Sequence, residues 1–538
     1  MTDAGPAFPI VSLAAWRARV EEELGSAELT DGGLDVAPLY TRRAGAEDDP
    51  AGFPGLWPGT RGATPGGRRE GPERIAVAAI PAFRDPLGEL AASGAVAGGL
   101  EAAFAALVRA VAAAGPGDRP AGISTLPYHE AGATPLQELA LALASGIAVL
   151  RHLEAAGIAP ANGAARIAFR FAVDRDVFAE IAKLRAARAL WSRVLAACGV
   201  LDPPPMWVHA VGSPRALARR DPWTNVLRGT TQMFAAICGG AGAVTALPFD
   251  SAGGAPSELG LRLARNTLAI LVEESRLGRV IDPAGGSWYV EERTEAMARG
   301  AWEELRSLEA AGGLPAALLS GEVRRRLDAS WAERRAAIAH RRLPITGVSE
   351  FPAADAPLRR EPVPPPPPPA PGVARIAPLP RRRDAAPFEA LRDAADALPA
   401  RPAIHLANLG PAGEHRSRAI FAASLFRAGG FLIVEEEGTG DAAPAAAAAL
   451  LAARFRASGA GASCLCGADS RYAAAVPGAA AALREAGARP VLLAGRPGER
   501  ESLWRAAGVD GFVHAGLDML AVLTDLLAAH GARPPEEP

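Results

Sequence analysis

Apolar residues follow two alternating patterns through most of the chain. Short apolar runs typical of buried strands are followed by longer segments in which apolar residues recur at helical spacing. In the first half, the strand runs lie at 75–80, 123–126, 167–173, 206–211 and 243–248. The helix patterns that follow them lie at 86–114, 134–156, 175–197, 222–238 and 257–277. Such alternation predicts a parallel sheet with right-handed crossovers.

One of these units, at 123–152, has a well-marked helix start. Thr134 suits the N-cap and Pro135 suits the first helical position. If such units close into a barrel, the preceding loop lies at the carboxyl face, where barrels keep their chemistry. His129 and Glu130 in this loop could form an acid/base pair. Because neighbours in sequence need not face each other, hydrogen bonding within the loop is the predicted role.

The second half repeats the alternation. Its strand runs lie at 403–407, 431–434, 462–466, 490–493 and 511–514. Its helix patterns lie at 414–428, 442–457, 471–487, 499–507 and 517–530. Five strands and five helices in strict alternation predict a flavodoxin-like, doubly wound domain.

Changes in composition divide the chain into four parts. Residues 1–74 form an arm with one short helix and turn-rich segments, and 75–345 form the first α/β domain, which ends in helices at 298–342. Residues 346–400 contain a run of prolines, which predicts an extended linker. Residues 401–538 form the second domain.

Composition narrows the function classes. The net charge of −2 gives no basic surplus for nucleic acid. No apolar run approaches the roughly 20 residues of a membrane span, and no signal peptide is recognisable at the N-terminus. Four cysteines, of which Cys464 and Cys466 alternate within a strand run, predict buried thiols in a reducing cytoplasm rather than disulfides or a metal site.

Several long motifs resemble the methylmalonyl-CoA mutase family. They are PLYT (38–41), GTRG (59–62), HEAGAT (129–134), EIAKLRAARALWSRV (180–194), DPWTNVLRGTTQMFAAICGG (221–240) and the block from RNT to DPAGGSWYV (265–290). The C-terminal segments LCGADSRYAAAV, ALREAGARPVLLAGRPG and VDGFVHAGLDMLAVLTDLL resemble the small (beta) subunit of heterodimeric bacterial members.

This resemblance implies a TIM-type (β/α) barrel for an acyl-CoA ester, followed by a flavodoxin-like domain of the adenosylcobalamin-binding type. The implied reaction is the radical interconversion of methylmalonyl-CoA and succinyl-CoA. It further implies a large (alpha) subunit as partner, which carries the adenosylcobalamin, the acyl-CoA substrate and the catalysis.

The family's functional positions are replaced in this chain. In the cobalamin motif Asp-x-His-x-x-Gly, Ala412 stands at the aspartate and Glu414 at the cobalt-ligating histidine. His415 lies one residue further on and is a weak candidate ligand. Pro127 replaces the histidine that hydrogen-bonds the substrate thioester, and Thr245 replaces a second family histidine. We therefore expect neither catalytic residues nor bound cobalamin in this chain.

The sequence also predicts that the first domain is a shortened barrel. Only five strands are well marked, with segments near Val280 and at 288–290 as a sixth candidate, and the family's first barrel strands have no counterpart. The leading hypothesis is a non-catalytic small subunit. An active acyl-CoA mutase that has recruited His415 or His129 is the second hypothesis, and a free-standing interaction protein is the third.

Overall fold

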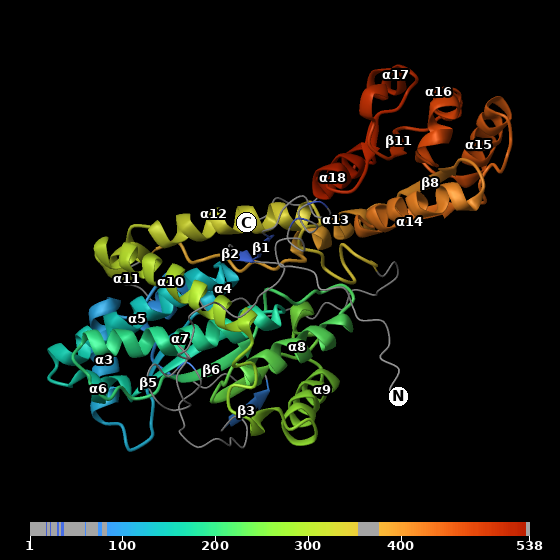
Figure 1. Ribbon diagram of the computed structural model, residues 1–538. Helices are drawn as coiled ribbons and strands as arrows, with labels where there is room; N and C mark the ends of the chain where they lie inside the picture. The colour runs from blue at the N-terminus through green and yellow to red at the C-terminus, as the bar shows by residue number, and fades with distance from the viewer. Residues whose placement is uncertain are drawn as a thin grey trace, which may run out of the picture.

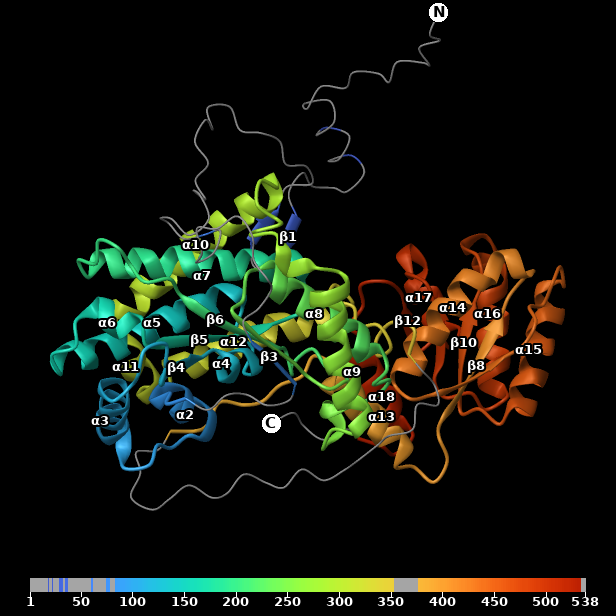
Figure 2. The same ribbon diagram turned by 90° about the horizontal axis from the view of Figure 1, so that it is seen from below.

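The described chain consists of two α/β units. A computed structural model describes residues 83–352 and 376–533, together with Ala18, Glu22, Thr60 and the short segments 29–31, 34–36 and 74–77. Most of the predicted arm and residues 353–375 of the predicted linker lie outside the described residues. The first unit lies at one end of the molecule and the second, drawn in orange and red, at the other (Figures 1 and 2).

The first unit contains a parallel five-stranded sheet. Its strands are β3 (Arg74–Val77), β4 (Ala121–Ser124), β5 (Ile167–Val173), β6 (Trp207–Gly212) and β7 (Ala243–Ala246). They lie in the order β3-β7-β6-β5-β4, and every neighbouring pair is parallel. The five predicted strands are confirmed. Within the described residues the sheet has two edges, so no closed eight-stranded barrel is present in that part of the chain.

The helices of this unit follow the prediction with three corrections. They are α2 (Pro86–Ser93), α3 (Gly99–Ala112), α4 (Leu126–Glu130), α5 (Pro135–Ala155), α6 (Pro160–Ala164), α7 (Val177–Ala197), α8 (Thr224–Cys238), α9 (Glu258–Ala269), α10 (Trp288–Ala310), α11 (Gly313–Leu319) and α12 (Glu322–Ala339). The predicted helix at 86–114 is two helices, because Gly94 turns left-handed with φ of 76°. The predicted loop around His129 is α4, and the candidate strand at 288–290 is the first turn of α10.

Helices α5 and α7 pack closely on one face of this sheet. The Trp191 ring meets Phe169 edge-on, with centroids 4.8 Å apart. Gly146 makes this approach possible, because a Cβ there would lie 2.6 Å from the Trp191 ring. Among the described residues, α5 alone is long and apolar enough to cross a membrane, and 72% of its most apolar window is buried inside the protein.

The β4 edge of the sheet is closed by residues 83–85 in place of a full strand. Arg84 pairs with β4 through Arg84 N–H to Pro120 O (3.0 Å) and Gly122 N–H to Arg84 O (2.9 Å). The Asp85 carboxylate then accepts from Ser124 N–H at 2.7 Å, where a neighbouring strand would offer a carbonyl. The backbone donors of this edge are therefore satisfied, as buried amides require.

We expect Asp85→Ala to destabilise the first unit by about 1–3 kcal/mol, because the Ser124 amide loses its acceptor. Burial raises the pKa of Asp85 from 3.8 to about 6. The contribution of Asp85 to the free energy of unfolding is therefore greatest below pH 3.8, and it is lost as the pH rises through 6. Urea denaturation should show a larger loss at pH 5 than at pH 8. Glu89→Ala is the control, because Glu89 is an exposed acid in α2, the helix that follows Asp85, and it should change stability little.

The second unit is a parallel five-stranded sheet flanked by helices. Its strands are β8 (Ala403–Asn408), β9 (Leu432–Glu435), β10 (Ala462–Cys466), β11 (Val491–Ala494) and β12 (Gly511–Val513). Its helices are α14 (Ala412–Ala428), α15 (Pro444–Ser458), α16 (Asp469–Glu485), α17 (Glu501–Ala506) and α18 (Met519–Ala529). The strand order β9-β8-β10-β11-β12 is that of a doubly wound sheet whose switch point lies between β8 and β10. The five predicted strands are confirmed.

Helix α13 (Ala386–Asp396) lies inside the range predicted as linker, 346–400. Its Phe388 and Leu391 are buried in a core that also contains Ile338 and Ile345 of the first unit. The same core continues into β8 and α14 of the second unit. This part of the range is therefore packed structure that joins the two units.

Candidate functional site

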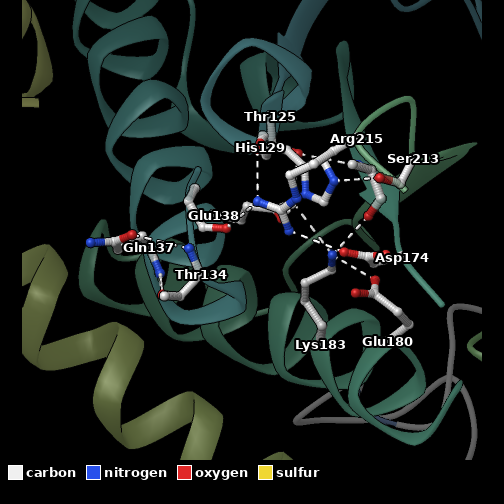
Figure 3. Close-up of polar contacts among 12 residues, drawn as sticks. Thr125, His129, Thr134, Gln137, Glu138, Asp174, Glu180, Lys183, Ser213 and Arg215 are labelled. Atoms are coloured by element: carbon white, nitrogen blue, oxygen red, sulfur yellow. Dashed lines mark hydrogen bonds and ion pairs between the residues drawn. The ribbon is translucent and has the colours of Figure 1, made fainter. Parts of the chain in front are cut away.

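Polar side chains gather at the carboxyl ends of β4, β5 and β6, under helix α4 (Figure 3). Thr125 extends β4, because its N–H donates to Arg170 O of β5, and its own carbonyl accepts from His129 N–H to start α4. The predicted N-cap at Thr134 is confirmed, with a reciprocal bond to Gln137. The result is a short helix that turns His129 inward from the end of the strand.

His129 links a serine to a carboxylate. Its Nδ1 lies 2.5 Å from Glu138 Oε1, and its Nε2 lies 2.6 Å from Ser213 Oγ. Burial lowers the pKa of His129, and Arg215 adds to that effect, while Glu138 opposes it. A neutral ring fits this geometry, with Nδ1–H donating to Glu138 and Nε2 accepting from the Ser213 hydroxyl. The His129 ring is thus hydrogen-bonded, but its partners lie outside the predicted loop, on α5 and just past β6.

Lys183 of α7 lies beneath this histidine between two acids. Its Nζ is 2.6 Å from Glu180 Oε2 and 3.4 Å from Glu138 Oε2, and it donates to Ala172 O at 2.7 Å. Burial alone would raise the pKa of Glu138, but Lys183 and His129 outweigh it and hold the pKa at about 2. Burial raises the pKa of Glu180 to about 7, although Lys183 opposes it. We call His129, Ser213, Glu138, Lys183 and Glu180 the carboxyl-end network.

A second group of charges joins the carboxyl-end network to α12 and to Asp384, which lies in the range predicted as linker. Arg215 donates to His129 O at 2.8 Å and pairs with Asp174 at 3.1 Å. Arg334 of α12 pairs with Asp174 at 3.3 Å and with Asp384 at 2.6 Å. Burial would raise the pKa of Asp174, but Arg334 and Arg215 hold it well below its usual range.

Thr245, which stands at a family histidine position, lies in β7 and is fully buried. Its hydroxyl lies 2.8 Å from His209 Nε2, and Arg170 Nε donates to His209 Nδ1 at 3.3 Å. Burial, with Arg170 adding to it, lowers the pKa of His209 to about 4. This histidine is therefore neutral at physiological pH and serves as a bridge between Arg170 and Thr245.

Pro127, at the other replaced position, lies in α4 and offers no donor. It lines a cavity of about 570 Å³ together with Asp85, Ser124 and Arg170. β5 and β6 separate β4, which precedes Pro127, from the strand of Thr245. The structure therefore does not bring these two positions together.

The carboxyl-end network has the connectivity of a nucleophile, a base and an orienting acid. Ser213 and His129 are fully buried, however, and Glu138 is 1% exposed. A base must come within hydrogen-bond reach of its substrate, directly or through one water. In this conformation these side chains offer no such access, and the network links α4, α5, α7 and the end of β6 inside the protein.

Sequence reasoning identified His129 but missed Glu138, Lys183, Glu180 and Ser213. The available signal was Glu180 and Lys183, which place opposite charges three residues apart within the apolar helix pattern at 175–197. Such pairs are common on exposed helix faces, so the spacing alone does not mark a buried site.

In the second unit, the residues at the family's cobalamin positions are engaged with the chain itself. Ala412 begins α14 and carries no ligating atom. The Glu414 carboxylate pairs with Arg471 at 2.6 Å, which lowers the pKa of Glu414. His415 is 6% exposed, and its Nδ1 lies 3.2 Å from Gly410 O. A Cβ on Gly438 would lie 2.4 Å from the His415 ring, so the Gly438 loop covers that ring.

These residues do not fit a corrinoid bound through this chain. A macrocycle coordinated by His415 would need the space that the backbone around Gly438 occupies. Glu414, at the ligand position, is a carboxylate committed to an arginine. We therefore derive no chemical step through cobalamin here.

Cys464 and Cys466 are free, fully buried thiols on β10. Burial raises the pKa of Cys464 well above its usual value. Both pack in the same core, as the alternation predicted. Within residues 83–352 and 376–533, no group of three or more histidine, cysteine and acidic side chains is placed to hold a metal ion.

Two parallel sheets, each flanked by helices, place the chain in the class of α/β proteins. Residues 81–405 match the family described as methylmalonyl-CoA mutase. Since this match covers more than half of the chain, the chain belongs to the methylmalonyl-CoA mutase family.

Individual relatives agree with this family. The methylmalonyl-CoA mutase small subunit of Streptomyces virginiae is 48% identical over 83% of this chain and 70% of its own length. The small subunit of Propionibacterium freudenreichii subsp. shermanii is 36% identical over 78% of this chain and 64% of its own length. The methylmalonyl-CoA mutase of Escherichia coli strain K12 is 35% identical over 43% of this chain and 33% of its own. The chain spans about two thirds of the small subunits that it matches.

Proposed function

We propose that the chain is the non-catalytic small subunit of a heterodimeric methylmalonyl-CoA mutase, which interconverts (R)-methylmalonyl-CoA and succinyl-CoA. In this proposal it supports a catalytic large subunit. The first unit is a TIM-type barrel that lacks its first strands, and the second is a degenerate, flavodoxin-like domain of the cobalamin-binding type. The assembly works in the cytoplasm without nucleic acid or membrane partners.

This proposal is supported by the burial of the candidate site in each unit. In the first unit, Ser213, His129 and Glu138 form a hydrogen-bonded chain that is at most 1% exposed. Pro127 and Thr245 stand where the family carries histidines. In the second unit the covered His415 and the paired Glu414 replace the cobalt ligand. We infer that adenosylcobalamin and the acyl-CoA substrate bind to the large subunit.

The test is to purify the chain alone and together with a large subunit. We expect no isomerisation of methylmalonyl-CoA by the chain alone with added adenosylcobalamin, and an active complex of one copy of each subunit by size determination. Isomerase activity of the chain alone would contradict the proposal. Failure to co-purify would instead favour a free-standing interaction protein.

An active mutase with a relocated histidine is the competing proposal. It requires His415 or His129 to act in place of the family residues. An imidazole-coordinated cobalt spectrum that disappears in His415→Ala would support it. The buried position of both rings is the observation against it.

A further inference from the structure

Residues 376–384 cross the first unit in extended form and have no helix or strand of their own. The segment starts beside α2, where Ile376 N–H donates to Gly94 O and Leu379 N–H donates to Ala91 O, both at 2.8 Å. From there it runs along α12 toward α13, as the orange trace in Figures 1 and 2 shows. We call residues 376–384 the strap.

The middle of the strap is bonded to α4 and α12. Arg382 N–H donates to Glu130 O at 2.9 Å, and its guanidinium donates to Ala131 O at 2.6 Å and pairs with Asp328 at 2.5 Å. The same guanidinium lies 5.5 Å from the centre of the Trp331 ring. Arg382 therefore fixes the end of α4, the helix that carries His129, against α12.

The end of the strap enters the charge cluster beside the carboxyl-end network. Asp384 N–H donates to Arg215 O at 3.0 Å, and its carboxylate accepts two bonds from Arg334, at 2.6 and 2.7 Å. Asp384 is fully buried. Arg215 in turn donates to His129 O and Ala133 O, on either side of the turn after α4. The strap is thus bonded to α4 directly through Arg382, and indirectly through Asp384 and Arg215.

We propose that the strap is a seal on the first unit. It holds α4 closed over the carboxyl ends of β4, β5 and β6, and so keeps solutes away from the hydrogen-bonded chain of Ser213, His129 and Glu138. Arg382 and Asp384 are its two anchors. Release of the strap frees α4 to open, whereas a strap that only ties the two units together would leave α4 unchanged when it is released.

Hydrogen exchange of the full chain, read by mass spectrometry, tests the seal. The double variant Arg382→Ala/Asp384→Asn removes the Arg382 guanidinium and the Asp384 charge, and leaves the backbone hydrogen bonds of both residues in place. We expect exchange to become at least about tenfold faster both in peptides that cover 376–384 and in peptides that cover 126–134, because protection follows local opening. Arg381→Ala is the matched control: its side chain is 78% exposed and 3.9 Å from Glu130, and both regions should stay as protected as in the unaltered chain.

Two results would overturn the proposal. If 376–384 loses protection while 126–134 keeps it, the strap does not hold α4. If 376–384 stays protected in the double variant, Arg382 and Asp384 are not its anchors. Should the double variant also lose protection in α7, the single variant Arg382→Ala repeats the comparison with the Asp384 anchor intact. Exchange is read without substrate or large subunit, so the seal and the proposed lack of activity can fail separately.

Discussion

Replacing Lys183 with methionine should cost the first unit about 3–5 kcal/mol, among the largest effects of any single substitution in this chain. Removing one partner of a buried ion pair leaves the other charge uncompensated, and that is the expensive outcome. Lys183 is fully buried and is the cation that faces both Glu138 and Glu180 at hydrogen-bonding distance. Equilibrium urea denaturation measures the loss.

The pH dependence of this loss identifies its cause. In the unaltered chain the pKa of Glu138 is about 2, below its ordinary 4.5, so Glu138 stabilises the fold above pH 4.5 and loses this contribution as the pH falls toward 2. Without Lys183, burial dominates for both acids and raises both pKa values. The loss should therefore be greatest above pH 7 and should shrink toward pH 5, as the carboxyls take up protons.

Glu180→Gln in the Lys183→Met background provides the matched test. It removes one of the two stranded charges while keeping the shape of the side chain. We expect the double variant to recover part of the lost stability at pH 8 and little at pH 5. A loss that is independent of pH and unchanged by Glu180→Gln would show that packing, rather than charge, sets the role of Lys183.

The strands were predictable because a buried strand appears in the sequence as a short run of apolar residues. β5 is buried at every position, and its run of apolar residues was recognised with its correct bounds. The ion pairs were not predictable, because their partners belong to different elements. Glu138 lies on α5 and Lys183 on α7, and only the pairing of β4 with β5 brings those helices together. In the sequence, each looks like an ordinary polar position on a helix.

The strap and α13 were not predicted, because the amino-acid composition around them is typical of a linker. Residues 376–385 are rich in proline and arginine and follow a run of prolines, so the range 346–400 was predicted as linker. Proline fixes φ and removes a backbone donor, but its presence does not show whether the segment packs against the rest of the protein. The arginines bond to carbonyls and acids of the first unit, such as Ala131 O and Asp328, and those partners are far away in the sequence.

Glu389→Ala should release α13 from the first unit, at a cost of about 3 kcal/mol. The Glu389 carboxylate is 1% exposed; it accepts from Arg219 N–H at 2.5 Å and from the Arg383 guanidinium at 2.6 Å. Burial would raise its pKa, but Arg383 and Arg219 outweigh that and lower it, so the group is ionised at neutral pH. Alanine leaves a buried backbone donor and an arginine without this acceptor, which is the costly way to break such a contact.

The consequence of Glu389→Ala should extend beyond the mutated helix. Because α13 shares its core with both units, undocking it should separate their unfolding, so that the second unit melts in its own transition. Asp396→Ala is the control on the same helix. Asp396 is 31% exposed, and without it the buried Arg220 keeps its other partner, Asp393, at 2.6 Å, so the loss should stay below about 1 kcal/mol. If Glu389→Ala and Asp396→Ala give the same single transition, the buried carboxylate does not couple the two units, and their shared apolar core is sufficient to do so.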